Sequence, residues 1–530
     1  MWVIKDNIMK NKLLIKSVLF CTATISLNVM GQNKVQQPNI IYIMCDDHCE
    51  QAMSCYGHSI NKTPNIDRIA NQGVRFTNCF VSNSICGPSR AVILTGKLSH
   101  MNGFMDNNST FDGSQQTFPK LLQGAGYETA IIGKWHLVSD PTGFNYWNIL
   151  PGQGDYYNPD FITNGKKERK EGYVTNLITD YSLEWLDKLR DKQKPFCLMI
   201  HHKAPHRNWM PDIKNLNKYD DANIPVPDNY FDDYATRGRA AHEQEMEIAK
   251  IMRPGADLKL FDPSKPGFPS FPTDSWLSRL NPTQLAAWVK AYDKKNKQFK
   301  DLHLTGKDLA IWKLRRYLQD YLATVESVDE SVGKILDYLD KTGLAKNTII
   351  IYTSDQGFYL GEHGWFDKRF MYEESLKTPL LIRYPGHIDK GWVCDKMVQN
   401  LDFAETILDY AGITIPKDMQ GISMKPLLEK KVSKIRDDIY YHYYEFPAEH
   451  MVKRHYGIRT ERYKLIHFYY DCDEWELYDL KEDPKEMNNI YSNPAYQTVI
   501  TTLKKRLEEM RKQYKVPSTN EEIKSIKVKS

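Results

Sequence analysis

The sequence predicts an α/β protein in which helices sandwich a mixed sheet, followed by a smaller C-terminal subdomain of antiparallel sheet and helix. Short runs rich in β-branched residues recur along the chain, and each ends in polar side chains. Stretches with helical spacing of apolar residues separate these runs, which favours strands linked by helices. Beyond about residue 425 the pattern changes to closely spaced short strands.

The first of these runs, residues 39–44, is followed after one cysteine by Asp46 and Asp47. A continuous apolar run of this length is typical of a strand buried on both faces of a parallel sheet. The same pattern predicts strands at 129–133, 196–200 and 348–353, followed by residues 134–136, 201–203 and 355–357. Because open α/β sheets bind ligands at the carboxyl ends of their strands, we expect these polar groups to converge.

Helical patterns lie between the strands. The segment 63–70 begins with a capping residue, Thr63, and has a proline in its first turn. Residues 309–339 carry apolar side chains at helical spacing and predict one long amphipathic helix or two. The intervening segment 208–306 is rich in Pro and Asp and longer than most loops, so we expect an irregular insertion that shapes the binding cleft.

The C-terminal part carries a different pattern. Short strands are predicted at 438–445, 455–460, 463–470 and 475–479, and a charged helix is predicted at 494–514. These elements predict a four-stranded antiparallel sheet with one helix. We therefore divide the chain into a signal peptide (1–31), a main α/β domain (36–425) and a C-terminal subdomain (426–530), whose tail is expected to fray.

Charge and the N-terminus bear on partners and location. The chain has 530 residues, with 71 Lys and Arg against 67 Asp and Glu, a net charge of +4 that calls for neither nucleic acid nor an anionic membrane. Basic residues followed by an apolar stretch at 13–30 predict a signal peptide cleaved near Gly31. Because Phe20 is a poor residue before a lipidated Cys21, we favour soluble export to the periplasm over a lipoprotein. No later apolar run is long enough to span a membrane.

The most informative segment is Cys86-Gly87-Pro88-Ser89-Arg90, which continues to Leu-Thr-Gly at residues 94–96. It resembles the signature of the type I sulfatases, Cys/Ser-x-Pro-Ser-Arg followed by Leu-Thr-Gly. The resemblance implies an alkaline-phosphatase-like fold. It also implies that a formylglycine-generating maturation enzyme oxidises Cys86 to formylglycine (3-oxoalanine), whose hydrate is the nucleophile. The plain alternative is a structural cysteine in a turn.

The resemblance also implies a metal site. Asp46, Asp47, Asp355 and Gln356 would supply oxygen ligands from two strand ends, with the modified Cys86 as a further ligand. Carboxylate and amide oxygens suit Ca²⁺, or alternatively Mg²⁺, better than zinc. Gln356 departs from the family, which more often has Asn or His at this position.

Five further side chains match motifs of the same family. By resemblance, Arg90 would hold the hydrate, Lys134 would bind a sulfate oxygen, and His136 would help to deprotonate the hydrate. His206, in Lys-Ala-Pro-His, would be the acid for the leaving oxygen, and Lys368 would bridge the sulfate. Taken without its motif, each of these His and Lys residues would be interpreted as an ordinary surface residue.

The segment Asp367-Lys368-Arg369, followed by Tyr-Glu, resembles the corresponding segment of N-acetylglucosamine-6-sulfatases. Asp367 and Arg369 would grip sugar hydroxyls, and His455, expected in a loop of the C-terminal subdomain, would roof the pocket. The alternative is a structural ion pair and a surface histidine. The resemblance implies an exo-acting enzyme that removes the 6-O-sulfate of N-acetylglucosamine or glucosamine from heparin- or heparan-type fragments, a step of glycosaminoglycan degradation.

Other functions remain open at this stage. The chain could act on another sulfated sugar, or be a phosphodiesterase or phosphonate hydrolase of the alkaline phosphatase superfamily. It could also be a carbohydrate-binding protein without catalysis. The nine cysteines do not specify disulfides by their spacing, and we interpret Cys45 and Cys49 as packing residues rather than zinc ligands.

Overall fold

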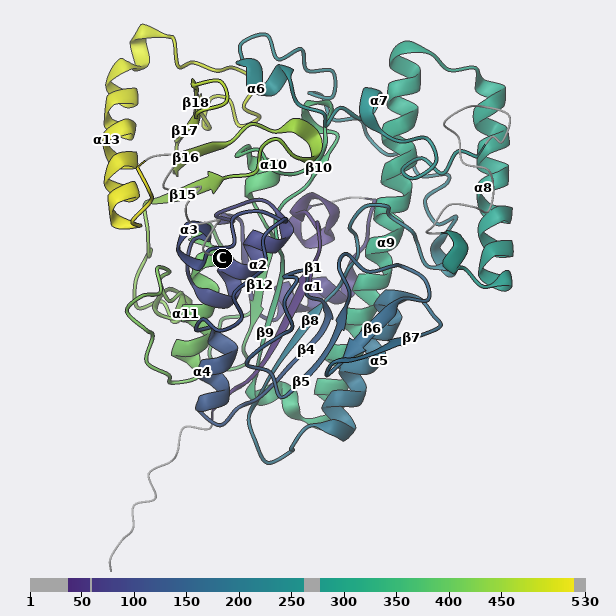
Figure 1. Cartoon of the computed structure of the whole chain (residues 1–530), viewed down its shortest axis with the longest axis vertical. Coiled ribbons are helices and arrows are strands. Elements are labelled where there is room, and N and C mark those ends of the chain that lie inside the picture. Colours follow the sequence, from purple (N-terminus) through teal and green to yellow (C-terminus); the bar gives the residue numbers. More distant parts are fainter. Residues whose placement is uncertain (1–36, 58–59, 262–276, 519–530) are drawn as a thin grey trace, which may run out of the picture. The chain divides into compact units, whose positions relative to one another are not determined.

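The computed structural model describes residues 37–57, 60–261 and 277–518 (Figure 1). The predicted signal peptide and the extreme C-terminal tail therefore lie outside the described residues. The described residues belong to one compact unit, so the division near residue 425 stays a prediction. Within the described part of the chain, no helix is both long enough and apolar enough to cross a membrane.

A mixed sheet of ten strands forms the centre of the protein, in the order β13-β2-β12-β9-β1-β8-β4-β5-β6-β7. Its core is parallel: β1 (Asn39–Cys45) lies between β8 (Phe196–His201) and β9 (Thr348–Ser354). The four predicted strands are confirmed, the fourth being β4 (Glu128–Lys134), which pairs with β8. The other strands are β2 (Val74–Phe76), β5 (Tyr146–Leu150), β6 (Asp160–Thr163), β7 (Lys166–Arg169), β12 (Leu380–Arg383) and β13 (Trp392–Cys394).

Both faces of this sheet are covered, which explains why β1 is apolar from Ile40 to Cys45. Ile41 and Ile43 contribute to the core on one face, whereas Ile40 and Tyr42 contribute to the core on the other. The first face packs against α1 (Pro64–Asn71), α5 (Val174–Glu184) and α9 (Gly306–Thr342). The second packs against α2 (Cys86–Thr95), α4 (Phe118–Gly124) and α11 (Phe403–Tyr410). The predicted helix–sheet–helix sandwich is confirmed.

The predicted long helix is a single one, α9, of 37 residues, which ends at Gly343 in a left-handed conformation. The expectation of an irregular insertion at 208–306 was wrong in part, because this segment contains the regular 21-residue helix α8 (Pro282–Leu302). Asn281 and Gln284 form a capping box at its start, and Trp288 is buried on its inner face. This segment also contains the short helices α6 (Arg239–His242) and α7 (Ile248–Ile251), and further short helices elsewhere are α3 (Ser99–Asn102), α10 (Glu373–Leu376) and α12 (Lys425–Leu428).

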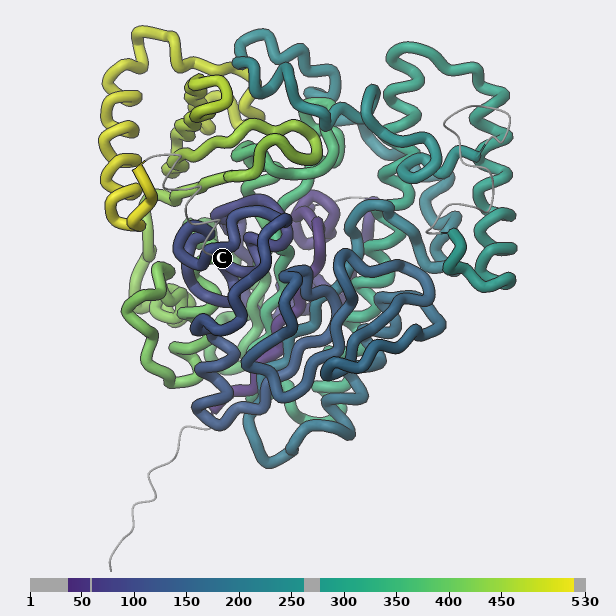
Figure 2. The backbone as a smooth tube through the Cα atoms, in the orientation of Figure 1, coloured from purple at the N-terminus to yellow at the C-terminus, as the bar shows by residue number. Residues whose placement is uncertain are grey.

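A separate four-stranded antiparallel sheet follows, as predicted: β15 (Asp438–Tyr443), β16 (His455–Thr460), β17 (Tyr463–Phe468) and β18 (Glu474–Asp479). Helix α13 (Gln497–Gln513) covers one face of this sheet, where Leu503 and Leu507 pack with Ile458 and Leu465. Figure 2 shows this yellow-green part beside the dark blue segment near residue 100. His100 Nε2 donates to the Tyr514 carbonyl there, at 2.9 Å. Two-stranded pairs complete the fold: β3 (Cys79–Phe80) with β14 (Val398–Gln399), and β10 (Tyr359–Leu360) with β11 (Phe366–Asp367).

The eight described cysteines are all free. The Cys45 sulfur lies 3.3 Å from the Tyr352 hydroxyl, and the Cys49 sulfur lies 3.5 Å from the Tyr321 hydroxyl. Both cysteines are buried, and neither belongs to a group of potential metal ligands among the described residues. They pack in the core, as their interpretation as packing residues requires.

Candidate active site

The carboxyl ends of β1 and β9 bring the predicted metal ligands together. Cys45 pairs with Ser354 in the parallel register, so Asp46 and Asp355 begin level with each other. The Asp47 backbone N–H donates to Asp355 Oδ1 at 3.2 Å, which fixes the second aspartate against the other strand end. The expected convergence of these strand ends is therefore present.

This cluster has the composition of a hard-cation site. Oxygens of Asp46, Asp47 and Asp355, all buried, lie within 4.8 Å of one another. Asp46 Oδ1 and Gln356 Oε1 have no hydrogen-bond partner. Burial, reinforced by the charge of Asp46, raises the pKa of Asp355 to about 7. Three buried carboxylates with unsatisfied oxygens are stable only beside positive charge, so these residues fit a divalent cation bound by oxygen.

Cys86 is the first residue of α2 and is 1% exposed. Its sulfur lies 3.5 Å from Gln356 Nε2 and belongs to one cluster with Asp46 and His206. Burial, followed by the nearby charge of Asp46, raises the pKa of the Cys86 thiol well above its usual range. The unmodified thiol is therefore protonated at neutral pH and is a weak nucleophile. The positive end of the α2 dipole favours negative charge at the same point.

Arg90, one turn along α2, connects the helix to Asp355 after β9 and to Lys134 at the end of β4. Its Nε and Nη2 atoms donate to Asp355 Oδ2 at 3.0 and 2.7 Å, and its Nη1 donates to the Lys134 carbonyl at 2.9 Å. The side chain is almost fully buried. A planar guanidinium with several fixed donors suits this bridging position better than a lysine would.

Lys134 is the last residue of β4 and His136 follows the strand, and neither residue lines the cavity. The Lys134 ammonium contacts the carboxylate of Asp46 and the side chain of Gln153. Gly133 has a φ of +110°, and a Cβ atom there would lie 2.0 Å from the His201 carbonyl oxygen, so only glycine fits. Burial, reinforced by Lys134, lowers the pKa of His136 to about 2, so its imidazole is neutral.

His206 and Lys368 approach the cluster from the open side. His206 Nδ1 donates to the Arg207 carbonyl at 2.6 Å, which leaves Nε2 facing Asp47, 3.8 Å from Oδ2. Lys368 Nζ lies 2.8 Å from the same carboxylate. The catalytic candidates thus surround the Asp46 and Asp47 carboxylates, although they come from segments far apart in the sequence.

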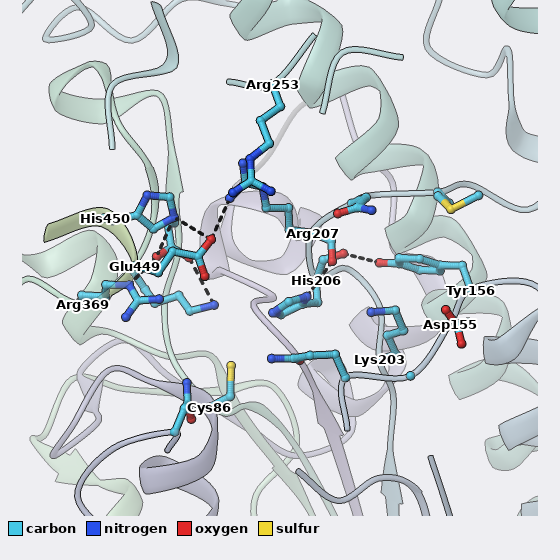
Figure 3. Close-up of a pocket in the computed structure, with 17 residues that line it drawn as sticks. Cys86, Asp155, Tyr156, Lys203, His206, Arg207, Arg253, Arg369, Glu449 and His450 are labelled. Atoms are coloured by element: carbon cyan, nitrogen blue, oxygen red, sulfur yellow. Dashed lines mark hydrogen bonds and ion pairs between the residues drawn. The ribbon is translucent and has the colours of Figure 1, made fainter. Parts of the chain in front are cut away.

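A cavity of about 320 Å³ opens above Cys86 (Figure 3). Five residues singled out in the sequence line it: Cys86, His206, Asp367, Lys368 and Arg369. Lys203, one of the polar residues expected after a strand, also lines it, and the remaining lining residues were not singled out: Asn107, Gln153, Gly154, Asp155, Tyr156, Arg207, Asn208, Met210, Arg253, Glu449 and His450. Three of them, Asn208, Met210 and Arg253, belong to the segment 208–306, so the insertion does shape the cleft.

Asp367 and Arg369 flank Lys368 on one wall, and both have the left-handed backbone that side chains rarely adopt, with φ of 80° and 91°. Arg369 Nε lies 2.7 Å from Asp367 Oδ2, and its Nη1 lies 2.8 Å from Glu445 Oε2. The structural ion pair considered above is therefore present. Both residues also line the cavity, so the two readings are compatible.

The expectation that His455 lies in a loop over the pocket was wrong. His455 is the first residue of β16, is fully buried, and stacks on Phe370 and Tyr441. The histidine on the cavity wall is His450, in the loop before that strand, with Nε2 3.6 Å from Asp367 Oδ2. The alternating pattern from residue 455 to 460 already indicated a strand, which would have directed attention to the earlier histidine.

Comparisons with known proteins agree with this arrangement. A family model described as Sulfatase matches residues 38–413, and one described as N-sulphoglucosamine sulphohydrolase, C-terminal, matches residues 361–513. An N-acetylglucosamine-6-O-sulfatase of Bacteroides thetaiotaomicron is 54% identical over 493 residues, which cover 91% of this chain and 88% of that protein. An N-acetylglucosamine-6-sulfatase of Bos taurus is 29% identical over 480 residues, covering 80% and 75% of the two chains.

A comparison with solved structures agrees with these sequence matches. The structure of a protein in complex with its substrate D-glucosamine-2-N,6-O-disulfate matches with a TM-score of 0.88. The two sequences are 54% identical, and the match covers 91% of this chain and 99% of the other.

Proposed function

The chain belongs to the sulfatase family and is a sulfuric ester hydrolase, and we propose that it removes the 6-O-sulfate of glucosamine or N-acetylglucosamine from the ends of heparin- or heparan-type fragments. One observation carries the proposal. The cavity joins the predicted nucleophile, Cys86, to a wall formed by Asp367, Arg369 and His450. This wall offers a carboxylate, a guanidinium and an imidazole, which suit recognition of neighbouring sugar hydroxyls.

The proposed nucleophile is a modified Cys86. We propose that a maturation enzyme oxidises this residue to formylglycine, whose hydrate carries two hydroxyls on one carbon. One hydroxyl attacks the sulfur and passes its proton to the carboxylate cluster, where the pKa of Asp355 is raised to about 7. In the same step His206, which enters as an imidazolium favoured by the charge of Asp46, gives its Nε2 proton to the leaving sugar oxygen. His136, held neutral by its burial, accepts the proton of the second hydroxyl, so that sulfate is released and the aldehyde returns.

Positive charge around the sulfate is the second requirement. Lys134 and Lys368 each lie against a carboxylate of the cluster and would turn toward the sulfate oxygens, while Arg90 would hold the hydrate. Asp46, Asp47, Asp355 and Gln356, with the modified Cys86, would hold Ca²⁺ or Mg²⁺. When bound, the ion would offset the negative charge of the ester oxygens.

Location and partners follow from the same proposal. The predicted signal peptide, which lies outside the described residues, would direct the protein to the periplasm, where sulfated oligosaccharides would reach it. The partners that we propose are such an oligosaccharide and the maturation enzyme. The nearly balanced charge of the chain gives no reason to add a nucleic acid to these partners.

The decisive experiment is sulfate release by matured, calcium-loaded protein from three substrates. These are N-acetylglucosamine-6-sulfate, galactose-6-sulfate and a disaccharide with a 2-O-sulfated uronate. We expect selective release from the first. Release from another sugar would keep the sulfatase and refute the substrate. No release from any substrate, with formylglycine confirmed by mass spectrometry, would refute the proposed mechanism.

A further inference from the structure

The cavity contains one buried cation that the proposed mechanism does not use. Lys203 is 4% exposed and lines the cavity. Among the described residues, no carboxylate forms an ion pair with its Nζ atom, which lies over the face of the Tyr156 ring, 4.8 Å from the ring centroid. A buried ammonium without an anionic partner is unfavourable, because the ring replaces only part of its lost hydration.

The other cations of the cavity differ in this respect. Arg207 donates two hydrogen bonds to Asp257, at 2.8 and 2.7 Å, and Arg369 and Lys368 each have a carboxylate partner. Arg253 has no such partner, but it is exposed and therefore solvated. Lys203 thus combines burial with an unmatched charge.

The electrostatic surroundings of Lys203 point the same way. Burial, followed by repulsion from Lys134, lowers the pKa of Lys203 to about 8. The side chain therefore carries its charge at neutral pH but is strained by the lack of a counter-ion. Asp46, Asp47 and Asp155 act on it only from a distance. An anion that enters the cavity would relieve this penalty directly.

Lys203 lies on the side of the cavity opposite the wall that is proposed to bind the sugar. Figure 3 shows Lys203 and Tyr156 on one side of the cavity and Arg369, Glu449 and His450 on the other, with His206 between them. A sugar held by the Asp367 wall, with its scissile sulfate at Cys86, would leave other ring substituents free to reach the Lys203 side. A negatively charged substituent on that side would lie close to the unpaired ammonium of Lys203.

We propose that Lys203 is a specificity-determining residue, which binds a second sulfate-type oxyanion carried by the substrate sugar. The enzyme would then prefer disulfated glucosamine to sugars with the 6-O-sulfate alone. This inference rests on the proposed function for the first sulfate. The second group can be N-linked or O-linked, since both present the same three oxygens to an ammonium.

The test measures binding without turnover. Calorimetry on the calcium-loaded Cys86→Ala protein would compare N-acetylglucosamine-6-sulfate with glucosamine-2-N,6-O-disulfate and glucosamine-3,6-di-O-sulfate. We expect at least one disulfated sugar to bind about ten-fold more tightly or better, in line with a charge-assisted hydrogen bond. Adding Lys203→Met should abolish this difference, whereas Lys203→Arg should retain most of it.

Controls separate this effect from misfolding. Lys188→Met replaces an exposed lysine outside the cavity and should leave the preference intact. Thermal unfolding of each variant would show whether it folds, and Lys203→Arg supplies a second variant if Lys203→Met does not. Equal affinity for all three sugars, or an unchanged preference in Lys203→Met, would overturn the inference. If the matured wild type released no 6-O-sulfate, the proposed function would fail, while the binding comparison would still decide the role of Lys203.

Discussion

Replacing His206 with alanine should slow sulfate release from a sugar far more than release from an aryl sulfate. An alcohol leaves poorly without a proton, whereas a phenolate leaves readily without one. His206 is placed for this role because its Nδ1 is committed to the Arg207 carbonyl, at 2.6 Å. Its Nε2 therefore faces the cluster of Asp47 and Cys86.

The expected magnitude follows from this geometry. One nitrogen is available for one proton transfer, and a positioned general acid contributes about 10²–10⁴-fold to a rate. This corresponds to roughly 3–5 kcal/mol of activation free energy. The turnover number for the sugar sulfate should fall by that factor. The turnover number for the aryl sulfate should fall by less than about ten-fold, since only packing beside Asp47 is lost.

The assay is ion-chromatographic detection of sulfate from N-acetylglucosamine-6-sulfate and from 4-nitrophenyl sulfate, with matured wild type and variant. His206→Gln keeps much of the side-chain volume and should behave like the alanine variant. His242→Ala, at an exposed histidine outside the cavity, should leave both rates unchanged. Equal losses on the two substrates in His206→Ala would refute the assignment of the acid.

Three further predictions concern the nucleophile, the backbone and a buried acid. Cys86→Ala should abolish turnover but retain sugar binding; wild-type rates in this variant would refute the nucleophile assignment. Gly133→Ala should lower the free energy of unfolding by about 3 kcal/mol or more, because a Cβ atom would strike the His201 carbonyl. Gly126→Ala, with a φ of +90° and open space around it, should lose only about 1–2 kcal/mol in the same thermal unfolding assay, and equal losses would contradict this reasoning. Burial raises the pKa of Asp329 from 3.8 to about 6. As the pH rises, Asp329 therefore loses its proton in the unfolded state before it does so in the folded state. The contribution of this residue to the free energy of unfolding is complete below pH 3.8 and is lost as the pH rises through about 6. The total loss should be about 3 kcal/mol, and Asp329→Asn should remove this slope in urea unfolding at pH 4 and pH 7, whereas an unchanged slope would argue against the shift.

The sequence was most informative where local pattern determines structure. Strands buried on both faces carry a continuous apolar stretch, so β1, β4, β8 and β9 could be recognised together with the polar residues at their carboxyl ends. Parallel pairing then brings those residues to one edge of the sheet. This is why Asp46 and Asp355 could be expected to meet although 309 positions separate them.

The sequence was least informative where the site depends on tertiary packing. His450 lies in a loop, and only the packing of the C-terminal sheet against the α/β core brings it to Asp367. Lys203 follows a buried strand as predicted, but its lack of a counter-ion is a property of the folded cavity. The charged composition of α8 obscured its helical pattern, whereas its capping box could have been recognised from Asn281 and Gln284.

The burial of Cys86 sets an order of events in the life of the protein. The residue is 1% exposed, and every residue of α2 is buried with it. The proposed maturation enzyme would therefore have to reach Cys86 while the chain is still open, before α2 docks against the sheet. The active fraction would then be fixed when each molecule folds. Molecules that fold with the thiol intact would stay inactive until they unfold, and no later exposure to the modifying enzyme could rescue them.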